Sequence, residues 1–135
     1  MLSHLRVIDL TTGSEQIGGQ MLGDLGADVI LVEPPGGSRS RFAGPYLGDR
    51  PDPNQSLNFW GWNRNKRSVI ADLESNEGRA RLRKLVRNAD IVLESFAPGY
   101  LDSIGLGYEG LAAINPRVVL ASISPYGATG PKAHW

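Results

Sequence analysis

Aromatic and cationic residues alternate within residues 60–67, which read Trp-Gly-Trp-Asn-Arg-Asn-Lys-Arg. Aromatic rings stack on a base, and guanidinium and ammonium groups bind phosphate, so the segment has the residue types for an anionic, adenine-bearing ligand. The same composition suits a loop whose tryptophans anchor it to the protein core. Composition favours neither interpretation over the other.

A second candidate for phosphate binding is a turn and helix start that contain Gly13, Gly18 and Gly19. Backbone amides at a helix N-terminus after such a turn bind phosphate. The glycine spacing is not that of the dinucleotide motif Gly-x-Gly-x-x-Gly, and no Lys-Ser or Lys-Thr follows as in a P-loop. The spacing therefore favours close packing of a helix on a sheet at Gly18 and Gly19.

The remaining polar residues form no recognisable catalytic set. Glu33 ends an apolar segment. In dinucleotide-binding folds an acidic residue at this position binds a ribose hydroxyl. Because the glycine motif is missing, a solvated strand end is favoured over a nicotinamide site. Neither His4 nor His134 has a nearby Ser, Cys or carboxylate pattern that would make a nucleophile–base pair, and we expect His134 in a loop. Several aspartates are scattered without the spacing of metal ligands: Asp9, Asp24, Asp28, Asp72, Asp90 and Asp102.

Strand and helix patterns alternate along the chain. Short apolar segments predict strands at residues 5–10, 27–32, 68–73, 90–93 and 118–124. Apolar residues at helical spacing predict helices at residues 17–25, from Ser75 or Asn76 to Ala89, and at residues 98–104 and 109–114. This alternation predicts an α/β fold, a mainly parallel sheet with flanking helices, with a long irregular excursion at residues 34–62.

The composition excludes several classes of protein. The 135 residues suffice for one domain, and a formal net charge of zero argues against a nucleic-acid partner. There is no cysteine, so disulfides and cysteine-bound metals are excluded. No secretory signal or run of roughly 18 apolar residues is present, so we expect a cytoplasmic protein without a membrane span.

The last residues of the chain have the composition of a loop. Residues 125–135 include two prolines and two glycines, and no closing element follows the last predicted strand. We therefore expect an incomplete domain, either a fragment or a chain whose natural continuation is missing.

A set of short motifs resembles the N-terminal part of the family III coenzyme A transferases, also called the CaiB/BaiF family. The motifs occur in the family's order and include Leu-Gly-Ala-Asp-Val-Ile-Leu-Val-Glu-Pro-Pro-Gly-Gly at residues 25–37, Asn-Arg-Asn-Lys-Arg-Ser-Val at 63–69, Ile-Gly-Leu-Gly-Tyr-Glu at 104–109 and Asn-Pro-Arg at 115–117. The resemblance covers essentially the whole chain. It implies that residues 1–135 form the N-terminal part of a Rossmann-like, coenzyme A-binding large domain.

The resemblance also implies an activity, the transfer of coenzyme A between carboxylic acids, with an acyl-coenzyme A and a carboxylic acid as substrates. In similar enzymes an aspartate takes the acyl group as a mixed anhydride and then carries coenzyme A as a thioester. That aspartate is expected beyond Trp135, so no catalytic residue is assigned within this chain. The resemblance implies a homodimer of interlocked chains and no metal.

Residues of this chain are assigned to the coenzyme A site by the same resemblance. The implied wall consists of Ala71, Leu73, Ser95, Phe96 and Ala97, with Lys66 or Arg67 supplying positive charge. The chain departs from the family at four positions. Ser95 stands where the family commonly has asparagine, and three residues stand where it often has a cation: Glu74, Ala97 and Ser103. Each lost charged hydrogen bond to a phosphate weakens binding by roughly 1.5–3 kcal/mol.

Two alternatives to the transferase remain open. One is a racemase or hydrolase of the same family. The other is a non-catalytic, degenerate module that serves assembly, which the lost cations favour and the intact motif at residues 63–69 opposes.

Overall fold

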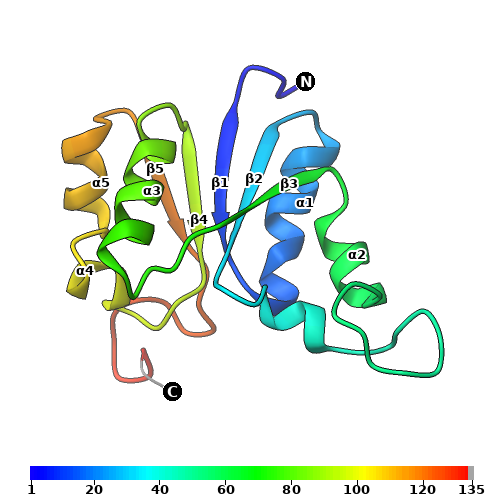
Figure 1. Ribbon diagram of the computed structural model, residues 1–135. Helices are drawn as coiled ribbons and strands as arrows, with labels where there is room; N and C mark the ends of the chain where they lie inside the picture. The colour runs from blue at the N-terminus through cyan, green and yellow to red at the C-terminus, as the bar shows by residue number, and fades with distance from the viewer. Residues whose placement is uncertain (134–135) are drawn as a thin grey trace.

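Five parallel strands form one sheet in the order β3-β2-β1-β4-β5 (Figure 1). The computed structural model describes residues 1–133, so the expectation for His134 lies outside the described residues. The strands are β1 (Arg6–Leu10), β2 (Asp28–Glu33), β3 (Lys66–Ile70), β4 (Ile91–Glu94) and β5 (Val119–Ser122). This is the strand order of Rossmann-like folds over their first five strands. The predicted α/β fold with a parallel sheet is confirmed.

Helices cover both faces of the sheet (Figure 1). They are α1 (Gln16–Asp24), α2 (Leu57–Asn63), α3 (Asn76–Val86), α4 (Tyr100–Ser103) and α5 (Tyr108–Ile114), with short 3-10 turns η1 (Gly13–Glu15) and η2 (Arg39–Phe42). The helices α1 and α2 lie on one side of the sheet, and α3, α4 and α5 on the other. No helix within residues 1–133 is long and apolar enough to cross a membrane.

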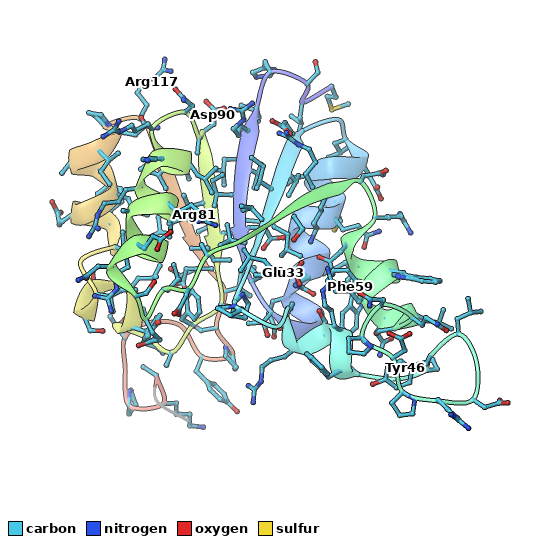
Figure 2. The ribbon with its side chains drawn as sticks, viewed as in Figure 1. Glu33, Tyr46, Phe59, Arg81, Asp90 and Arg117 are labelled. Atoms are coloured by element: carbon cyan, nitrogen blue, oxygen red, sulfur yellow. The ribbon has the colours of Figure 1, made fainter. Side chains whose placement is uncertain are left out.

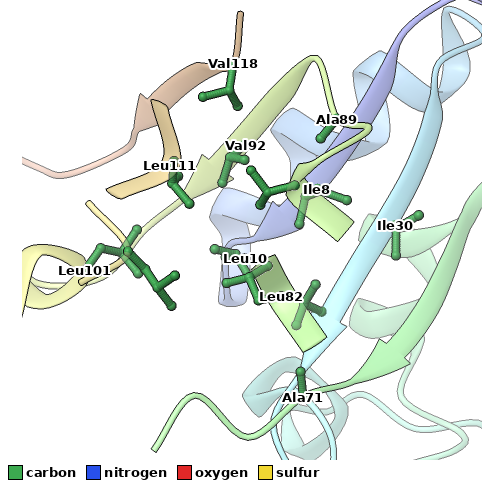
Figure 3. Close-up of a cluster of buried hydrophobic side chains, with 13 residues drawn as sticks. Ile8, Leu10, Ile30, Ala71, Leu82, Ala89, Val92, Leu101, Leu111 and Val118 are labelled. Carbon is green, nitrogen blue, oxygen red and sulfur yellow. The ribbon is translucent and has the colours of Figure 1, made fainter. Parts of the chain in front are cut away.

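The inner strands are apolar because both of their faces are buried. On the α3 side, Ile8, Ile30 and Val92 pack with Leu82 and other helix residues in the larger core (Figure 3). On the α1 side, the alternate strand residues Val7, Val29 and Leu93 form a smaller cluster. Successive strand side chains point to opposite faces, so one short apolar run supplies both clusters.

Several predicted boundaries are corrected by the structure. Helix α3 ends at Val86 instead of Ala89, and β5 spans Val119–Ser122 instead of residues 118–124. The third strand is Lys66–Ile70 instead of residues 68–73, and it lies at the edge of the sheet. Residues 34–62 are not irregular throughout, because they contain η2 and most of α2. The side chain of Ser56 accepts a hydrogen bond from the backbone N–H of Phe59 and so caps α2. A helix this short depends on packing, here against α1, more than on propensity.

Candidate functional site

A cavity of about 230 Å³ lies where β1, β2, β3 and β4 end. Leu10 and Val32 form part of its floor, the segment after β3 forms one wall and the segment after β4 another. In open parallel sheets, ligands bind outside the carboxyl ends of the strands, where the strand order changes direction. Here that point lies between β1 and β4, so the cavity has the position of a ligand site.

Three of the predicted site residues line this cavity: Ala71, Leu73 and Phe96. Ala71 and Leu73 follow β3 instead of belonging to it, because the strand ends at Ile70. Ser95 and Ala97 line a neighbouring hollow, of which Phe96 is also a part. The hydroxyl of Ser95 accepts a hydrogen bond from the backbone N–H of Thr12 at 3.1 Å and so joins the ends of β4 and β1.

An aromatic pair and a carboxylate form the far wall of the cavity. The rings of Phe96 and Tyr100 lie with their centroids 4.8 Å apart, in a tilted arrangement. The Tyr100 hydroxyl donates a hydrogen bond of 2.5 Å to the carboxylate of Glu74. Burial, together with this carboxylate, raises the pKa of Tyr100 to about 12. Tyr100 is therefore a neutral hydrogen-bond donor at physiological pH.

The structure places Lys66 away from the cavity, inside a polar cluster between α1 and the sheet. Its side chain is 1% exposed, and its ammonium lies 2.8 Å from the carboxylate of Asp9, which is fully buried. The ammonium also donates to the backbone carbonyl of Gln16 at 2.7 Å and to the side-chain oxygen of Asn63 at 2.9 Å. Burial lowers the pKa of the Lys66 ammonium, and the Asp9 charge opposes this effect. With three acceptors for its three protons, Lys66 serves the structure of the domain.

This ion pair connects to the cavity through the turn after β1. The other oxygen of Asp9 accepts hydrogen bonds from the backbone N–H and the hydroxyl of Thr11, at 2.9 and 2.6 Å. Thr11 lines the cavity, so the Lys66–Asp9 pair fixes one part of its wall. A Cβ atom on Gly19 would collide with the Asp9 carboxylate, so the predicted close packing is confirmed at Gly19. A Cβ atom on Gly18 would fit without a collision, so the packing does not require glycine there.

The neighbouring cations of the motif at residues 63–69 pair with aspartates outside the cavity. Arg67 binds Asp28 with a closest distance of 2.6 Å, and its side chain is 66% exposed. Arg64 and the side-chain amide of Asn65 both bind Asp24, at 2.9 and 2.7 Å. None of the described residues 60–67 lines the cavity. In this structure the motif joins α1, α2 and the sheet.

Glu33, at the end of β2, is buried and has protein partners for both oxygens (Figure 2). Arg41 binds it through two nitrogens, and the backbone N–H of Ser38 and the hydroxyl of Ser68 also donate to it. The Arg41 guanidinium lies 3.7 Å from the centre of the Phe59 ring. Glu33 is therefore neither a solvated strand end nor open to a ribose hydroxyl, and it fastens the excursion after β2 to β3.

Acid should weaken this cluster. Desolvation raises the pKa of Glu33, but the hydrogen bonds from Arg41, Ser68 and Ser38 outweigh it, so the pKa lies below its ordinary value of 4.5. A carboxyl with a lowered pKa stabilises the fold above its unfolded-state pKa and loses this contribution as pH falls. We expect the Glu33→Gln variant to be less stable at pH 7 than the parent, the protein without the substitution. Between about pH 5 and pH 3 the stability of the variant should fall by less than that of the parent.

Urea unfolding across this pH range measures the effect. The control is Glu77→Gln, because the Glu77 side chain is 85% exposed in a surface pair and should leave the pH profile nearly unchanged. Equal pH dependence in the parent and Glu33→Gln would contradict the prediction.

Sequence reasoning missed one cation that lines the cavity. Arg39 is the first residue of η2, is exposed and forms part of the cavity wall beside Ser38. Its only signal in the sequence is its position after the Pro-Pro-Gly-Gly turn that follows β2. The cavity thus combines an apolar floor, an aromatic face, one guanidinium and the carboxylates of Asp72 and Glu74.

Comparison with known proteins decides the family. The model of CoA-transferase family III matches residues 2–135. The chain belongs to this family. It is 47% identical over 133 residues to the acetyl-CoA:oxalate CoA-transferase of Acetobacter aceti, covering 97% of this chain and 33% of that protein. It is 46% identical over 136 residues to the succinate–glutarate CoA-transferase of Agrobacterium fabrum, covering 98% of this chain and 34% of that protein.

Solved structures agree with the family III assignment. A CAIB/BAIF family protein from Brucella suis superposes with a TM-score of 0.87 at 44% identity, over 96% of this chain and 35% of that chain. The Rv3272 protein of Mycobacterium tuberculosis superposes with a TM-score of 0.88 at 37% identity, over 100% of this chain and 36% of that chain. The chain spans about a third of the length of the curated relatives it matches.

Proposed function

We propose that this chain forms the coenzyme A-binding part of an enzyme that transfers coenzyme A between carboxylic acids. The observation that carries the proposal is the cavity at the carboxyl ends of the strands, with Phe96 on one wall and Arg39 on another, in a chain of the transferase family. The curated relatives are named as transferases acting on acetyl-CoA and oxalate or on succinate and glutarate. The substrates proposed here are accordingly an acyl-coenzyme A and a carboxylic acid.

The cavity suits one end of coenzyme A. Its volume of about 230 Å³ is below the roughly 300–1,000 Å³ of pockets that enclose a drug-sized ligand. We infer that the adenine end enters it and that the rest of the molecule extends over the surface. Phe96 offers an aromatic face to a flat base, and the exposed guanidinium of Arg39 offers charge to a phosphate.

The proposed chemistry divides between the ligand and the protein. Coenzyme A supplies the thiol that carries the acyl group. This chain's residues bind and orient it, while the aspartate that forms the acyl and thioester intermediates is proposed to lie outside residues 1–135. The cavity carboxylates have structural partners, which supports this division: Asp72 accepts from the backbone N–H of Glu74, and Glu74 accepts from Tyr100.

Association of two chains in the cytoplasm is part of the proposal. Three large apolar side chains of α1 and its end are exposed at helical spacing: Ile17 at 50%, Met21 at 60% and Leu25 at 45%. An exposed apolar stripe of this kind is typical of a surface that another protein segment covers. It supports a homodimer as the assembled form.

A single substitution tests the site. We expect Phe96→Ala to weaken coenzyme A binding roughly two- to tenfold, because it removes an aromatic face worth about 0.5–1.5 kcal/mol. NAD should bind negligibly to both proteins. Calorimetric titration with each ligand measures this, with Phe42→Ala as the matched control, since Phe42 is an exposed phenylalanine that does not line the cavity.

Two results would contradict the assignment. Equal coenzyme A affinity in the parent and Phe96→Ala would remove Phe96 from the site. Tight binding of NAD would overturn the choice of ligand.

One observation favours a second candidate, a non-catalytic assembly module of the same fold. Glu74 adds negative charge to the cavity proposed for the adenine end of coenzyme A, a ligand that carries several phosphates. Failure of the parent to bind coenzyme A in the same titration would favour this module over the transferase.

A further inference from the structure

The charges of the cavity are divided between two walls. Arg39, in the segment after β2, carries the positive charge, whereas Asp72 and Glu74 after β3 carry negative charge. A ligand with several phosphates meets attraction at the first wall and repulsion at the second. The two walls therefore distinguish between phosphates by their position on the ligand.

Several hydrogen bonds hold the negative wall in place. The Tyr100 hydroxyl fixes the Glu74 carboxylate at 2.5 Å, and the Glu74 backbone N–H donates to Asp72 at 3.0 Å. Arg79, the cation beside this turn, donates to the backbone carbonyls of Leu73 and Glu74 at 2.6 and 3.3 Å. Its guanidinium thus braces the backbone of the wall, and Glu74 cannot turn away from the cavity without losing its bond to Tyr100.

We propose that Glu74, held by Tyr100, is a specificity-determining residue that discriminates against a phosphate on the ribose of the ligand. The inference rests on the proposed function. With the adenine end in the cavity, the diphosphate of coenzyme A extends toward Arg39 and solvent, while the 3′-phosphate lies near the wall formed by Glu74. Glu74 is exposed, so solvent and salt screen the repulsion between its carboxylate and a phosphate, but two anionic groups at close range still repel each other. The protein should accordingly bind dephospho-coenzyme A, which lacks only the 3′-phosphate, at least as tightly as coenzyme A.

The test is a pair of calorimetric titrations, with coenzyme A and with dephospho-coenzyme A, on the parent and three variants. In the parent we expect coenzyme A to bind no tighter than dephospho-coenzyme A. Glu74→Lys should shift the ratio of the two dissociation constants by roughly tenfold or more in favour of coenzyme A, because repulsion becomes attraction. Glu74→Gln should shift the ratio in the same direction by less.

The third variant, Glu77→Lys, is the matched control. It makes the same change of net charge on the nearby first turn of α3, where Glu77 is exposed and does not line this cavity. The ratio of its dissociation constants for coenzyme A and dephospho-coenzyme A should stay within about twofold of the parent's ratio. An unchanged ratio in Glu74→Lys, or a parent that prefers coenzyme A tenfold, would overturn the role of Glu74 while leaving the proposed function intact. Failure of the parent to bind either compound would instead overturn the proposed function.

Discussion

Replacing Lys66 with methionine should lower the free energy of unfolding by about 3–5 kcal/mol, the usual effect of removing one partner of a buried ion pair. The change leaves the Asp9 carboxylate buried and without its cation, 2.8 Å from where the ammonium was. The acceptor groups of Gln16 and Asn63 lose their donor at the same time. Because a domain of this size is stable by only about 5–15 kcal/mol, this loss is a large part of the total.

Urea unfolding monitored by circular dichroism measures the loss. The control is Arg67→Met, one position along β3, because an exposed pair such as Arg67–Asp28 contributes about 0–1 kcal/mol. The double variant Asp9→Asn with Lys66→Met should recover part of the loss, since it leaves no unpaired charge and an amide oxygen can still accept from Thr11. Equal losses in Lys66→Met and Arg67→Met would show that the buried pair contributes no more than a surface one.

Alanine at Gly78, in the first turn of α3, should destabilise the protein by about 1–3 kcal/mol or more. A Cβ atom there would collide with the backbone carbonyl of Asp72, and backbone cannot rotate out of the way as a side chain can. The collision would push α3 away from the segment after β3, which is the wall that carries Leu73 and Glu74. We therefore expect weaker coenzyme A binding as well as lower stability.

The same substitution at Gly61 should have the opposite sign. Gly61 lies inside α2, and nothing is within 4 Å of the position that its Cβ would occupy. Alanine is a better helix former than glycine by about 1 kcal/mol, so Gly61→Ala should raise the urea midpoint slightly. The two glycine-to-alanine changes thus report two different effects on stability: Gly61→Ala reports helix propensity, and Gly78→Ala reports close packing. A loss of stability at Gly61, or a gain at Gly78, would contradict this interpretation.

The inner strands could be predicted from the sequence because they are covered on both faces. Apolar runs located β1, β2 and β4 to within one residue. The prediction starts the edge strand β3 two residues late, since the strand begins with two cations, Lys66 and Arg67, that do not fit the apolar pattern of a strand. Its position depends on pairing with β2 and on the buried contact with Asp9, and both come from residues distant in the sequence. The short helix α2 was missed for the same reason.

The candidate site was predicted in part. The family resemblance selected Ala71, Leu73 and Phe96, which line the cavity. Lys66 or Arg67 is the predicted source of the positive charge that Glu74, Ala97 and Ser103 do not supply. The sequence does not show that Lys66 is buried against Asp9 and that Arg67 pairs with Asp28. The place of Arg39 and the contact between Glu74 and Tyr100 depend on how the segments after β2, β3 and β4 meet, and no local sequence pattern indicates this.

The central place of β1 has a consequence during synthesis on the ribosome. One edge of β1 pairs with β2, which follows closely, but its other edge pairs with β4, and the contact from Arg6 to Asp90 spans 84 positions. At roughly 5–20 residues per second, a ribosome needs about 4–17 s to make the intervening chain. Throughout this time the innermost strand of the finished sheet is an outer edge with unpaired backbone groups. Such an edge is a template for incorrect pairing, so the nascent chain passes through an aggregation-prone stage that the folded protein no longer has.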